Sequence, residues 1–367
     1  MIKIGILTFQ NACNFGAVLQ AYALKTYLEQ CDVTIVEIIN YKNQQIEKEK
    51  LLWKNLFENN ILKQIIRNTL LLPYIYRRNR LFNSFNTEYL GLSKEINKEQ
   101  MNNLDYDLYI VGSDQVWNRQ LTENDRTFFC DFCENNVPCY SYAASIGSSK
   151  FTDIELGQLK NLLERFSSIS FRERELVPIF KSVLPNKKIV SCLDPVYLLD
   201  NQLWGELCIN PKRKPYLLIF CVGSNPELTP TIEFAKKLAN SKGLDVIYMS
   251  DQDIWYKHRE VEHCGAVAPG EFLGYIRSAE YVVTNSFHAT SFSIIFHTSF
   301  YSETGLSRNG RVINILDLMG LNDRALKKGK AKKDYLKEID WNMVEKKISD
   351  EKAFSKEYLI NIVRNNI

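Results

Sequence analysis

The chain lacks the long apolar runs of a membrane protein. Hydrophobic residues make up 45% of its 367 residues, which is enough for sizeable cores, but no segment approaches the roughly 18 consecutive apolar residues that cross a bilayer. The first residues, MIKIGILTFQ, also lack the basic segment, longer apolar core and cleavage site of a signal peptide. These absences predict a cytoplasmic protein.

The sequence has no excess of one charge. It contains 46 Lys and Arg residues against 43 Asp and Glu residues, for a formal net charge of +3. Proteins that bind nucleic acid generally carry a strongly basic face and a high pI. We therefore expect no nucleic-acid partner.

The nine cysteines are scattered without the spacing of a disulfide framework, which indicates free thiols in a reducing compartment. Cys130 and Cys133 form a CxxC pair, with Cys139 nearby. A zinc site needs a second Cys or His pair at ligand spacing, and none follows. We expect buried thiols here and no metal.

Strand-like and helix-like runs alternate along the chain, which is typical of parallel α/β sheets. The first series of strand-like runs lies at 2–9, 33–39, 106–113, 138–145, 167–173 and 188–195. A polar stretch with two prolines follows residue 200, and the alternation then restarts. The pattern predicts an α/β protein of two Rossmann-like domains, residues 1–200 and 201–367, facing each other across a cleft.

Residues 42–82 interrupt the first domain as a predicted helical insertion. Lys and Arg outnumber Glu in this segment, and aromatic residues are interleaved with them. One interpretation is peripheral contact with an anionic membrane surface at the inner face. The other is a helical pair packed on the domain with a solvated basic face.

Polar residues follow several of the predicted strands. Parallel sheets bind ligands beyond the carboxyl ends of their strands, so these positions are candidate site residues. In the first domain they are Asn14, Gly16, Ser113, Asp114, Gln115 and Arg172. Each also has a structural interpretation, for example a turn glycine at Gly16 or a helix cap at Asp114.

His288 is one of only four histidines and lies where the strand YVVTN meets the helix ATSFSIIF. Asn285 or Ser286 is the expected N-cap of that helix. A helix N-terminus favours an anion, so a bound phosphate or carboxylate would lie beside the imidazole. Arg308 and Arg311 follow the next strand-like run. With Arg172 they would supply guanidinium groups for a dianionic substrate, and His288 would transfer a proton.

Seven segments carry a resemblance to a known family, in order from residue 4 to about residue 324. They are GILTFQNACNFGAVLQAYAL, YDLYIVGSDQVWN, YAASIG, ISFRERE, LDPVYLL, VTNSFHATSFSIIF and RVINILDLMGLNDR. Together they resemble the polysaccharide pyruvyl transferases, with VGSDQVWN and TNSFHAT the most specific. Two positions depart from the expected pattern: Phe15 stands where a Tyr is expected, and Ala289 follows His288 where many members have Gly.

The resemblance implies transfer of a pyruvyl group from phosphoenolpyruvate to two hydroxyls of a sugar, forming a cyclic ketal and releasing phosphate. Phosphoenolpyruvate is the donor substrate, and no cofactor or metal is expected. The acceptor would be a surface polysaccharide, such as a capsule or exopolysaccharide, or its lipid-linked oligosaccharide precursor. The implied fold is similar to that of GT-B glycosyltransferases, in which a C-terminal helix, here 345–366, crosses back to the first domain.

The resemblance also implies roles for the candidate residues. His288 would be the acid, and Arg172 would bind the donor and stabilise the leaving phosphate. The donor side would also include Asn285, Ser286 and either Arg308 or Arg311. The acceptor side would comprise Asn14, Gly16, Ser113, Gln115 and Asp114, with Asp114 a candidate base.

Two other functions stay open at this point. A GT-B glycosyltransferase using a nucleotide sugar would have the same fold, and Glu303 could then hold the ribose hydroxyls. A non-catalytic carbohydrate-binding protein has little need for a histidine beside paired arginines. A dinucleotide-dependent dehydrogenase is disfavoured because the first βα turn is not GxGxxG.

Overall fold

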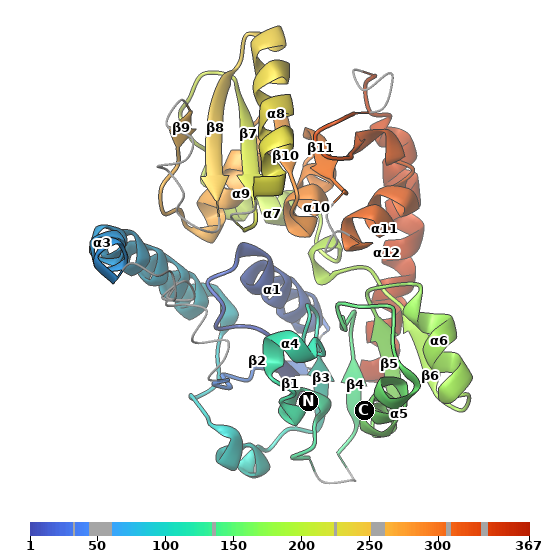
Figure 1. Cartoon of the computed structure of the whole chain (residues 1–367). Coiled ribbons are helices and arrows are strands. Elements are labelled where there is room, and N and C mark those ends of the chain that lie inside the picture. The colour runs from blue at the N-terminus through green and yellow to red at the C-terminus, as the bar shows by residue number, and fades with distance from the viewer. Residues whose placement is uncertain are drawn as a thin grey trace. The chain divides into compact units, whose positions relative to one another are not determined.

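A computed structural model describes residues 1–31, 34–43, 61–133, 137–223, 226–250, 261–305, 310–331 and 337–367 (Figure 1). The chain divides into two compact units. Unit 1 draws on residues 1–54, 83–199 and 350–367, and unit 2 on residues 55–82 and 200–349. Within the described ranges, no helix is both long enough and apolar enough to cross a membrane.

Unit 1 is built on a six-stranded parallel sheet of order β2-β1-β3-β4-β5-β6. Its strands are β1 (Ile2–Leu7), β2 (Thr34–Ile38), β3 (Leu108–Val111), β4 (Cys139–Ser141), β5 (Ser168–Phe171) and β6 (Lys188–Ser191). Its helices include α1 (Phe15–Glu29), α4 (Arg119–Thr122), α5 (Asp153–Leu163) and α6 (Leu176–Val183). The strands are short and largely apolar because helices cover the sheet, as in doubly wound folds.

Trp117 forms the centre of the unit 1 core. Its side chain is fully buried, lies parallel to Phe129 with ring centroids 5.5 Å apart, and donates a 2.8 Å hydrogen bond to the Phe128 carbonyl. Phe171 of β5 and Phe166 pack against its edges. The tryptophan of the VGSDQVWN segment therefore stabilises the fold and holds the polar residues before it in place.

Unit 2 repeats the architecture with a second parallel sheet of order β12-β11-β10-β7-β8-β9. Its strands are β7 (Tyr216–Cys221), β8 (Asp245–Ser250), β9 (Glu262–His263), β10 (Tyr281–Thr284), β11 (Ser299–Glu303) and β12 (Ala325–Leu326). Its helices include α7 (Asn201–Leu207), α8 (Thr229–Lys242), α9 (Pro269–Arg277), α10 (Phe287–Ile295) and α11 (Gly310–Met319). The two parallel α/β sheets predicted from the sequence are confirmed.

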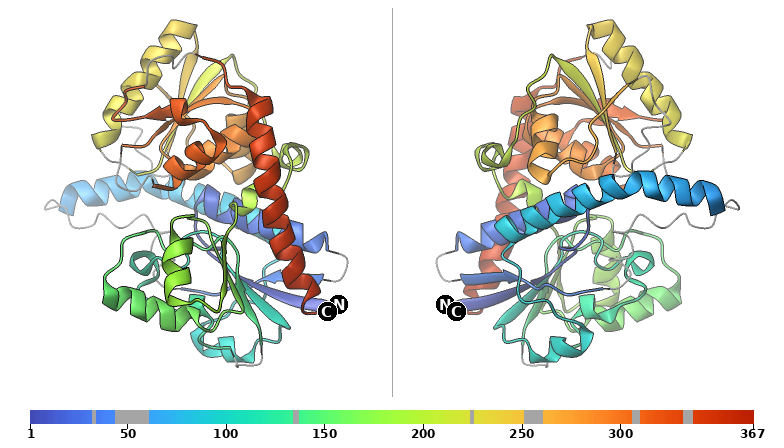
Figure 2. Two further views of the ribbon diagram at one scale, coloured as in Figure 1. Left: turned by 90° about the vertical axis from the view of Figure 1, so that its right-hand side faces the viewer. Right: turned by 90° about the vertical axis from the view of Figure 1, so that its left-hand side faces the viewer.

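Helices cover both faces of the unit 2 sheet. Figure 2 shows α8 on one face, with α9 and α10 on the other. Consecutive residues of β7 point to opposite faces, so Ile219 joins the core beneath α8, whereas Phe220 meets Phe272 of α9 with ring centroids 5.0 Å apart. This alternation along a fully buried strand is expected of a sheet covered on both sides.

The last helix, α12 (Trp341–Arg364), begins in unit 2 and ends in unit 1. In its second half the Tyr358 hydroxyl pairs with Ser168 Oγ at 2.8 Å and donates to the Ser141 carbonyl at 3.0 Å. Leu359 and Val363 are buried. Residues 350–367 therefore group with unit 1. The predicted second domain, 201–367, included these residues, and the family resemblance implied that its C-terminal helix crosses back to the first domain.

The predicted insertion at 42–82 is described only in part. Residues 44–60 lie outside the described ranges, and α3 (Ile61–Phe85) follows them. Its residues up to Phe82 group with unit 2 and not with the first domain, which had been expected to carry the insertion. Membrane contact by this segment stays a prediction.

Gly274 of α9 tests how tightly the unit 2 helices pack. A Cβ at this position would overlap the carbonyl of Ile209, whereas a Cβ at Gly157 of α5 would meet nothing within 4 Å. We expect Gly274→Ala to destabilise the protein by about 1–3 kcal/mol through overpacking. We expect Gly157→Ala to stabilise it by about 0.5–1 kcal/mol, because alanine favours a helix interior. Thermal unfolding of both variants checks this. Equal changes in melting temperature would show that Gly274 is not tightly packed against Ile209.

Candidate active site

Most of the predicted site residues that the structure describes follow the strands at the topological switch point of each sheet, whereas Arg172 follows β5 and Arg311 lies after β11. In unit 1 the strand order reverses between β1 and β3, and in unit 2 it reverses between β7 and β10. Doubly wound sheets bind ligands at such points, beyond the carboxyl ends of the strands. The segments that follow these four strands are therefore the first places to look for a site.

Asn285 joins the two central strands of unit 2. Its amide accepts from the Val222 N–H at 2.8 Å and donates to the Val222 carbonyl at 3.0 Å. This pairing holds the segment after β10 against the segment after β7. Asn285 was predicted to bind the donor. Its side chain bridges two segments within unit 2, and its contact with the donor stays a prediction.

Ser286 is the N-cap of α10, as predicted. Its hydroxyl accepts from the Ala289 N–H at 3.4 Å, and its own N–H donates to Thr284 Oγ1 at 2.9 Å. Thr290 donates to the Ser286 carbonyl at 2.8 Å and pairs with Ser302 of β11 at 2.7 Å. These bonds fix the first turn of the helix to the sheet, and thereby fix the direction of its N–H groups.

His288 lies on this first turn and is 8% exposed. Its ring meets Phe287 edge to face at a centroid distance of 5.2 Å. Arg311, on α11, places its guanidinium carbon 6.0 Å from the centroid of the same Phe287 ring. The structure thus brings an imidazole and a guanidinium to the N-terminal turn of α10. Arg308 lies outside the described residues.

Glu303 has a structural role at the end of β11. The residue is fully buried, and each of its carboxylate oxygens accepts two hydrogen bonds. Oε1 accepts from the Gly305 N–H at 2.7 Å and from the Lys328 N–H at 2.9 Å. Oε2 accepts from Thr231 Oγ1 at 2.6 Å and from the Gly329 N–H at 2.8 Å. A carboxylate in this position is not exposed to a ribose. The reading of Glu303 as a nucleotide-binding residue is therefore wrong.

In unit 1 the structure brings Ser113, Asp114 and Arg172 together around Asp194. The Asp194 carboxylate accepts from Arg172 Nη1 at 2.8 Å and from Ser113 Oγ at 3.3 Å, while Arg172 Nη2 lies 3.5 Å from Asp114 Oδ1. The side chains of Arg172 and Asp194 are 4% and 0% exposed. This cluster lies just beyond the carboxyl ends of β3 and β5.

The carboxylates keep Arg172 charged in spite of its burial. Burial acts to lower the pKa of the guanidinium, but the negative charges of Asp194, Asp114 and Glu173 raise it above its ordinary value. Because its charge is already balanced within unit 1, Arg172 is a positioning residue for the Ser113–Asp114 segment. Its predicted contact with the donor stays a prediction.

Gln20 of α1 supports the same segment from the other side. Its Nε2 donates to Thr8 Oγ1 at 2.8 Å, and its Oε1 accepts from the Ser113 N–H at 3.2 Å. Thr8 donates in turn to the Ser113 carbonyl at 3.2 Å. Neither Gln20 nor Asp194 was singled out from the sequence. Asp194 offered a signal, since it lies near the end of the strand-like run at 188–195, but Gln20 lies inside a predicted helix and offered none.

The remaining predicted acceptor residues occupy the edges of this switch point. Asn14 is exposed and caps α1 by accepting from the Ala17 N–H at 3.2 Å, and Gly16 is buried in the first turn of that helix. Gln115 accepts from Asn118 Nδ2 at 2.8 Å. Asn14 and Gln115 thus have structural partners, and their contact with an acceptor stays a prediction.

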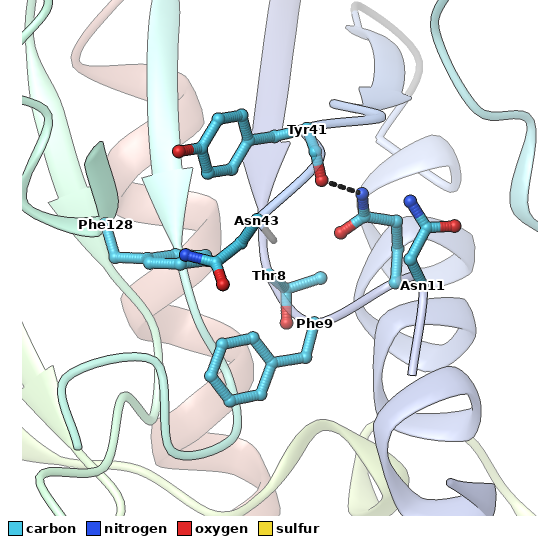
Figure 3. A pocket seen from close by; sticks show the side chains of 7 residues that line it. Thr8, Phe9, Asn11, Tyr41, Asn43 and Phe128 are labelled. Carbon is cyan, nitrogen blue, oxygen red and sulfur yellow. Dashed lines mark hydrogen bonds between the residues drawn. The ribbon is translucent and has the colours of Figure 1, made fainter. Parts of the chain in front are cut away.

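A narrow pocket lies beyond the carboxyl ends of β1 and β2 (Figure 3). The rings of Phe9, Tyr41 and Phe128 line it, and Gln10 donates to the Tyr41 carbonyl at 3.0 Å. Asp125 fixes two of the lining side chains by accepting hydrogen bonds from the Tyr41 hydroxyl at 2.6 Å and from Asn43 Nδ2 at 2.8 Å. The sequence did not indicate this pocket, because its aromatic residues come from three separate segments.

Two cysteines of the CxxC region lie close together, with 3.8 Å between Cys133 Sγ and Cys139 Sγ. Cys130 is fully buried. Among the residues whose positions are described, no group of three His, Cys, Asp or Glu side chains could hold a metal ion.

The buried Arg172 should contribute strongly to stability. We expect Arg172→Met to cost about 3–5 kcal/mol, because Asp194 and Asp114 would be left buried without a cation. Arg174→Met is the matched control, since Arg174 is 53% exposed and pairs with Glu351 at the surface; its cost should stay below about 1 kcal/mol. Urea unfolding measures the loss of unfolding free energy in each variant. Equal losses would show that the buried ion pair does not contribute more to stability than the exposed one.

Asp125 should make stability depend on pH. Partial burial raises the pKa of its carboxyl, but hydrogen bonds from Tyr41, Thr127 and Asn43 lower it by more, so its pKa lies below the ordinary value. Its stabilising contribution is then fully present above the unfolded-state pKa of about 4 and is lost as the pH falls through the folded value. We expect Asp125→Asn to lower the free energy of unfolding by about 1–3 kcal/mol at pH 7. The difference between wild type and variant should disappear as the pH falls.

Unfolding curves at several pH values test this, with the exposed Asp131→Asn as control. The proposed role of Asp125 would be contradicted if the difference in unfolding free energy between the wild type and Asp125→Asn did not change with pH. It would also be contradicted if Asp131→Asn showed the same pH-dependent difference.

Comparison with known proteins agrees with this geometry. A family model described as polysaccharide pyruvyl transferase matches residues 14–303. No curated protein matches the chain. Among solved structures, MnaA of S. aureus with UDP is similar over 100% of this chain and 98% of its own, at 12% identity and a TM-score of 0.54. The UDP-GlcNAc 2-epimerase of Methanocaldococcus jannaschii is similar over 99% of this chain and 100% of its own, at 11% identity and a TM-score of 0.51.

At such low identity the structural likenesses show the fold alone, which is that of the two-domain GT-B proteins. The family match covers most of the chain and contains both His288 and the Ser113–Gln115 segment. It confirms the family resemblance seen in the sequence. The chain belongs to the polysaccharide pyruvyl transferase family.

Proposed function

We propose that the protein transfers the pyruvyl group of phosphoenolpyruvate to two hydroxyls of a sugar, forming a cyclic ketal and releasing phosphate. The acceptor is a sugar of a surface polysaccharide or of its lipid-linked precursor. The observation that carries the proposal is the position of His288 on the first turn of α10, with the Arg311 guanidinium at the neighbouring Phe287 ring, in a chain of this family.

The first turn of α10 suits the donor because phosphoenolpyruvate carries both a phosphate and a carboxylate. The first N–H groups of a helix have no carbonyl partner within the helix, and the helix dipole favours negative charge there. A guanidinium adds two parallel donors for a planar or tetrahedral anion. Arg311 supplies that group, and Arg308 is a second candidate for the same role.

The imidazole of His288 supplies the proton that starts the reaction. In its protonated form it donates that proton to C3 of the enol, which turns the methylene into a methyl group and leaves positive charge at C2. A sugar hydroxyl then attacks C2 and gives its proton to a base, for which Asp114 is the candidate, while the imidazole takes up a new proton from solvent. General acid catalysis of this kind contributes about 10²–10⁴-fold to a rate.

Loss of phosphate from the tetrahedral intermediate completes the transfer. The bond from C2 to the phosphate oxygen breaks, the second hydroxyl closes the ring at C2, and its proton leaves with the phosphate. Arg311 and the N–H groups of α10 stabilise the charge that builds up on the departing oxygen. The steps need no oxidant, metal or cofactor, so phosphoenolpyruvate acts as substrate only.

The acceptor is assigned to the switch point of unit 1. There Ser113 and Asp114 are held in place by Arg172, Asp194 and Gln20, which suits hydroxyl-directed hydrogen bonds from a rigid segment. Asp114 remains the candidate base on this side. A nucleotide-sugar transferase is less well supported, because Glu303 is occupied by four hydrogen bonds.

Replacing His288 tests the catalytic assignment. We expect His288→Ala to lower acceptor-dependent phosphate release by about 10²–10⁴-fold, with phosphoenolpyruvate binding largely retained in calorimetry. His297→Ala is the matched control, because His297 pairs with Glu345 at 2.7 Å and stacks on Trp341 at the surface of unit 2. If the His288 variant stayed within about twofold of the wild-type rate, His288 could not be the acid.

A further inference from the structure

A second and larger pocket opens in unit 1 beyond the carboxyl ends of β3 and β4. Its cavity volume is about 220 Å³, somewhat below the usual range of about 300–1,000 Å³ for small-molecule sites, and the pocket is open to solvent on one side. Its walls come from the start of α4, from the loop after β4 and from the first turns of α5. None of the site residues predicted from the sequence lines it.

The pocket is joined directly to the predicted acceptor segment. Asn118 lines it, caps α4 by accepting from the Gln120 N–H at 3.1 Å, and donates to Gln115 at 2.8 Å. Gly147 closes the other side with a φ of +78°, and a Cβ there would come within 2.5 Å of Asn118 Nδ2 and 2.7 Å of Gln115 Oε1. Glycine at this position lets the loop after β4 approach the Gln115–Asn118 segment closely.

The lining resembles that of a saccharide site. Amide, hydroxyl and guanidinium groups from Asn118, Gln120, Ser148 and Arg119 accompany the aromatic ring of Phe151. Sugar rings offer hydroxyls to such polar groups and an apolar face to an aromatic ring. A few placed polar groups around an apolar surface are what fix the orientation of a small ligand.

The charges in the pocket favour an anion. Glu155 is held in the capping box of α5, where hydrogen bonds from the Thr152 N–H and hydroxyl, both at 2.8 Å, and the nearby charge of Arg119 lower the pKa of its carboxyl. Arg119 Nη1 also donates to Gln158 of α5 at 2.8 Å. Among the described residues, Lys150 forms no ion pair with a carboxylate. Arg119 and Glu155 largely offset each other, so Lys150 leaves the pocket positive.

We propose that this pocket holds the saccharide acceptor next to the Ser113–Gln115 segment, and that Lys150 and Arg119 select an acceptor carrying a negative charge. The assignment as acceptor rests on the proposed function; the binding of an acidic saccharide does not. The charge is either a carboxylate, as in a uronic acid, or a phosphate on the sugar. Both are bound by the same cation pair.

Saccharide binding by the purified full-length protein, without phosphoenolpyruvate, tests the pocket. The probes are methyl glycosides in gluco, galacto and manno forms, the corresponding uronic acids and the corresponding 6-phosphates, titrated by saturation-transfer NMR into the millimolar range. We expect at least one acidic probe to bind on the order of fivefold tighter than its neutral counterpart. Preference for uronic acids or for phosphates identifies the source of the charge.

Three variants locate the binding. Arg119→Gln combined with Lys150→Gln should remove the preference for acidic probes, and Gln120→Trp should block neutral and acidic probes alike by filling the pocket. Lys160→Gln, on α5 but outside the pocket, should leave binding unchanged. Circular dichroism confirms that each variant is folded.

Three outcomes overturn the proposal: no acidic probe binds, acidic and neutral probes bind equally, or the double variant keeps the preference. These outcomes are separate from the test of pyruvyl transfer. If acidic saccharides bind as expected but no phosphate is released from phosphoenolpyruvate with any of them, the proposed function fails and the saccharide site stands.

Discussion

Parallel pairing of every strand is the constraint on which the rest of this protein depends. In a parallel sheet all carboxyl ends meet at one edge, and the reversal of strand order opens a gap there. The structure repeats this arrangement in two sheets, at β1 and β3 and at β7 and β10. The polar segments that follow these strands are therefore assembled by topology, before any particular side chain is considered.

Buried hydrogen bonds then fix the positions of the segments that follow these strands. In unit 1 the carboxylate of Asp194 holds Arg172 and Ser113, and in unit 2 the amide of Asn285 links the ends of β7 and β10. Residues of this kind occupy the same positions along the chain as ligand-binding groups. Their hydrogen bonds position other groups, such as the first turn of α10 that carries His288, and their contact with a ligand stays a prediction.

Local patterns predicted the two sheets, the capped helix at Ser286 and the place of His288, because each depends on residues close together in the sequence. The pairing of Arg172 with Asp194 and the enclosure of Glu303 depend on residues brought together by the fold, so no spacing rule could reveal them. The return of residues 350–367 to unit 1 was implied by the family resemblance and not by any local pattern. The sequence also did not indicate the pocket at Lys150, because its walls come from three separate elements.

The most direct test of the account is the reaction itself, run in D2O with phosphoenolpyruvate and a panel of acidic and neutral saccharides, with the product analysed by NMR and mass spectrometry. Protonation of C3 by an exchangeable acid predicts a ketal whose new methyl group carries one deuterium, formed together with free phosphate. Consumption of a nucleotide sugar in place of phosphoenolpyruvate, with no ketal from any acceptor, would contradict it.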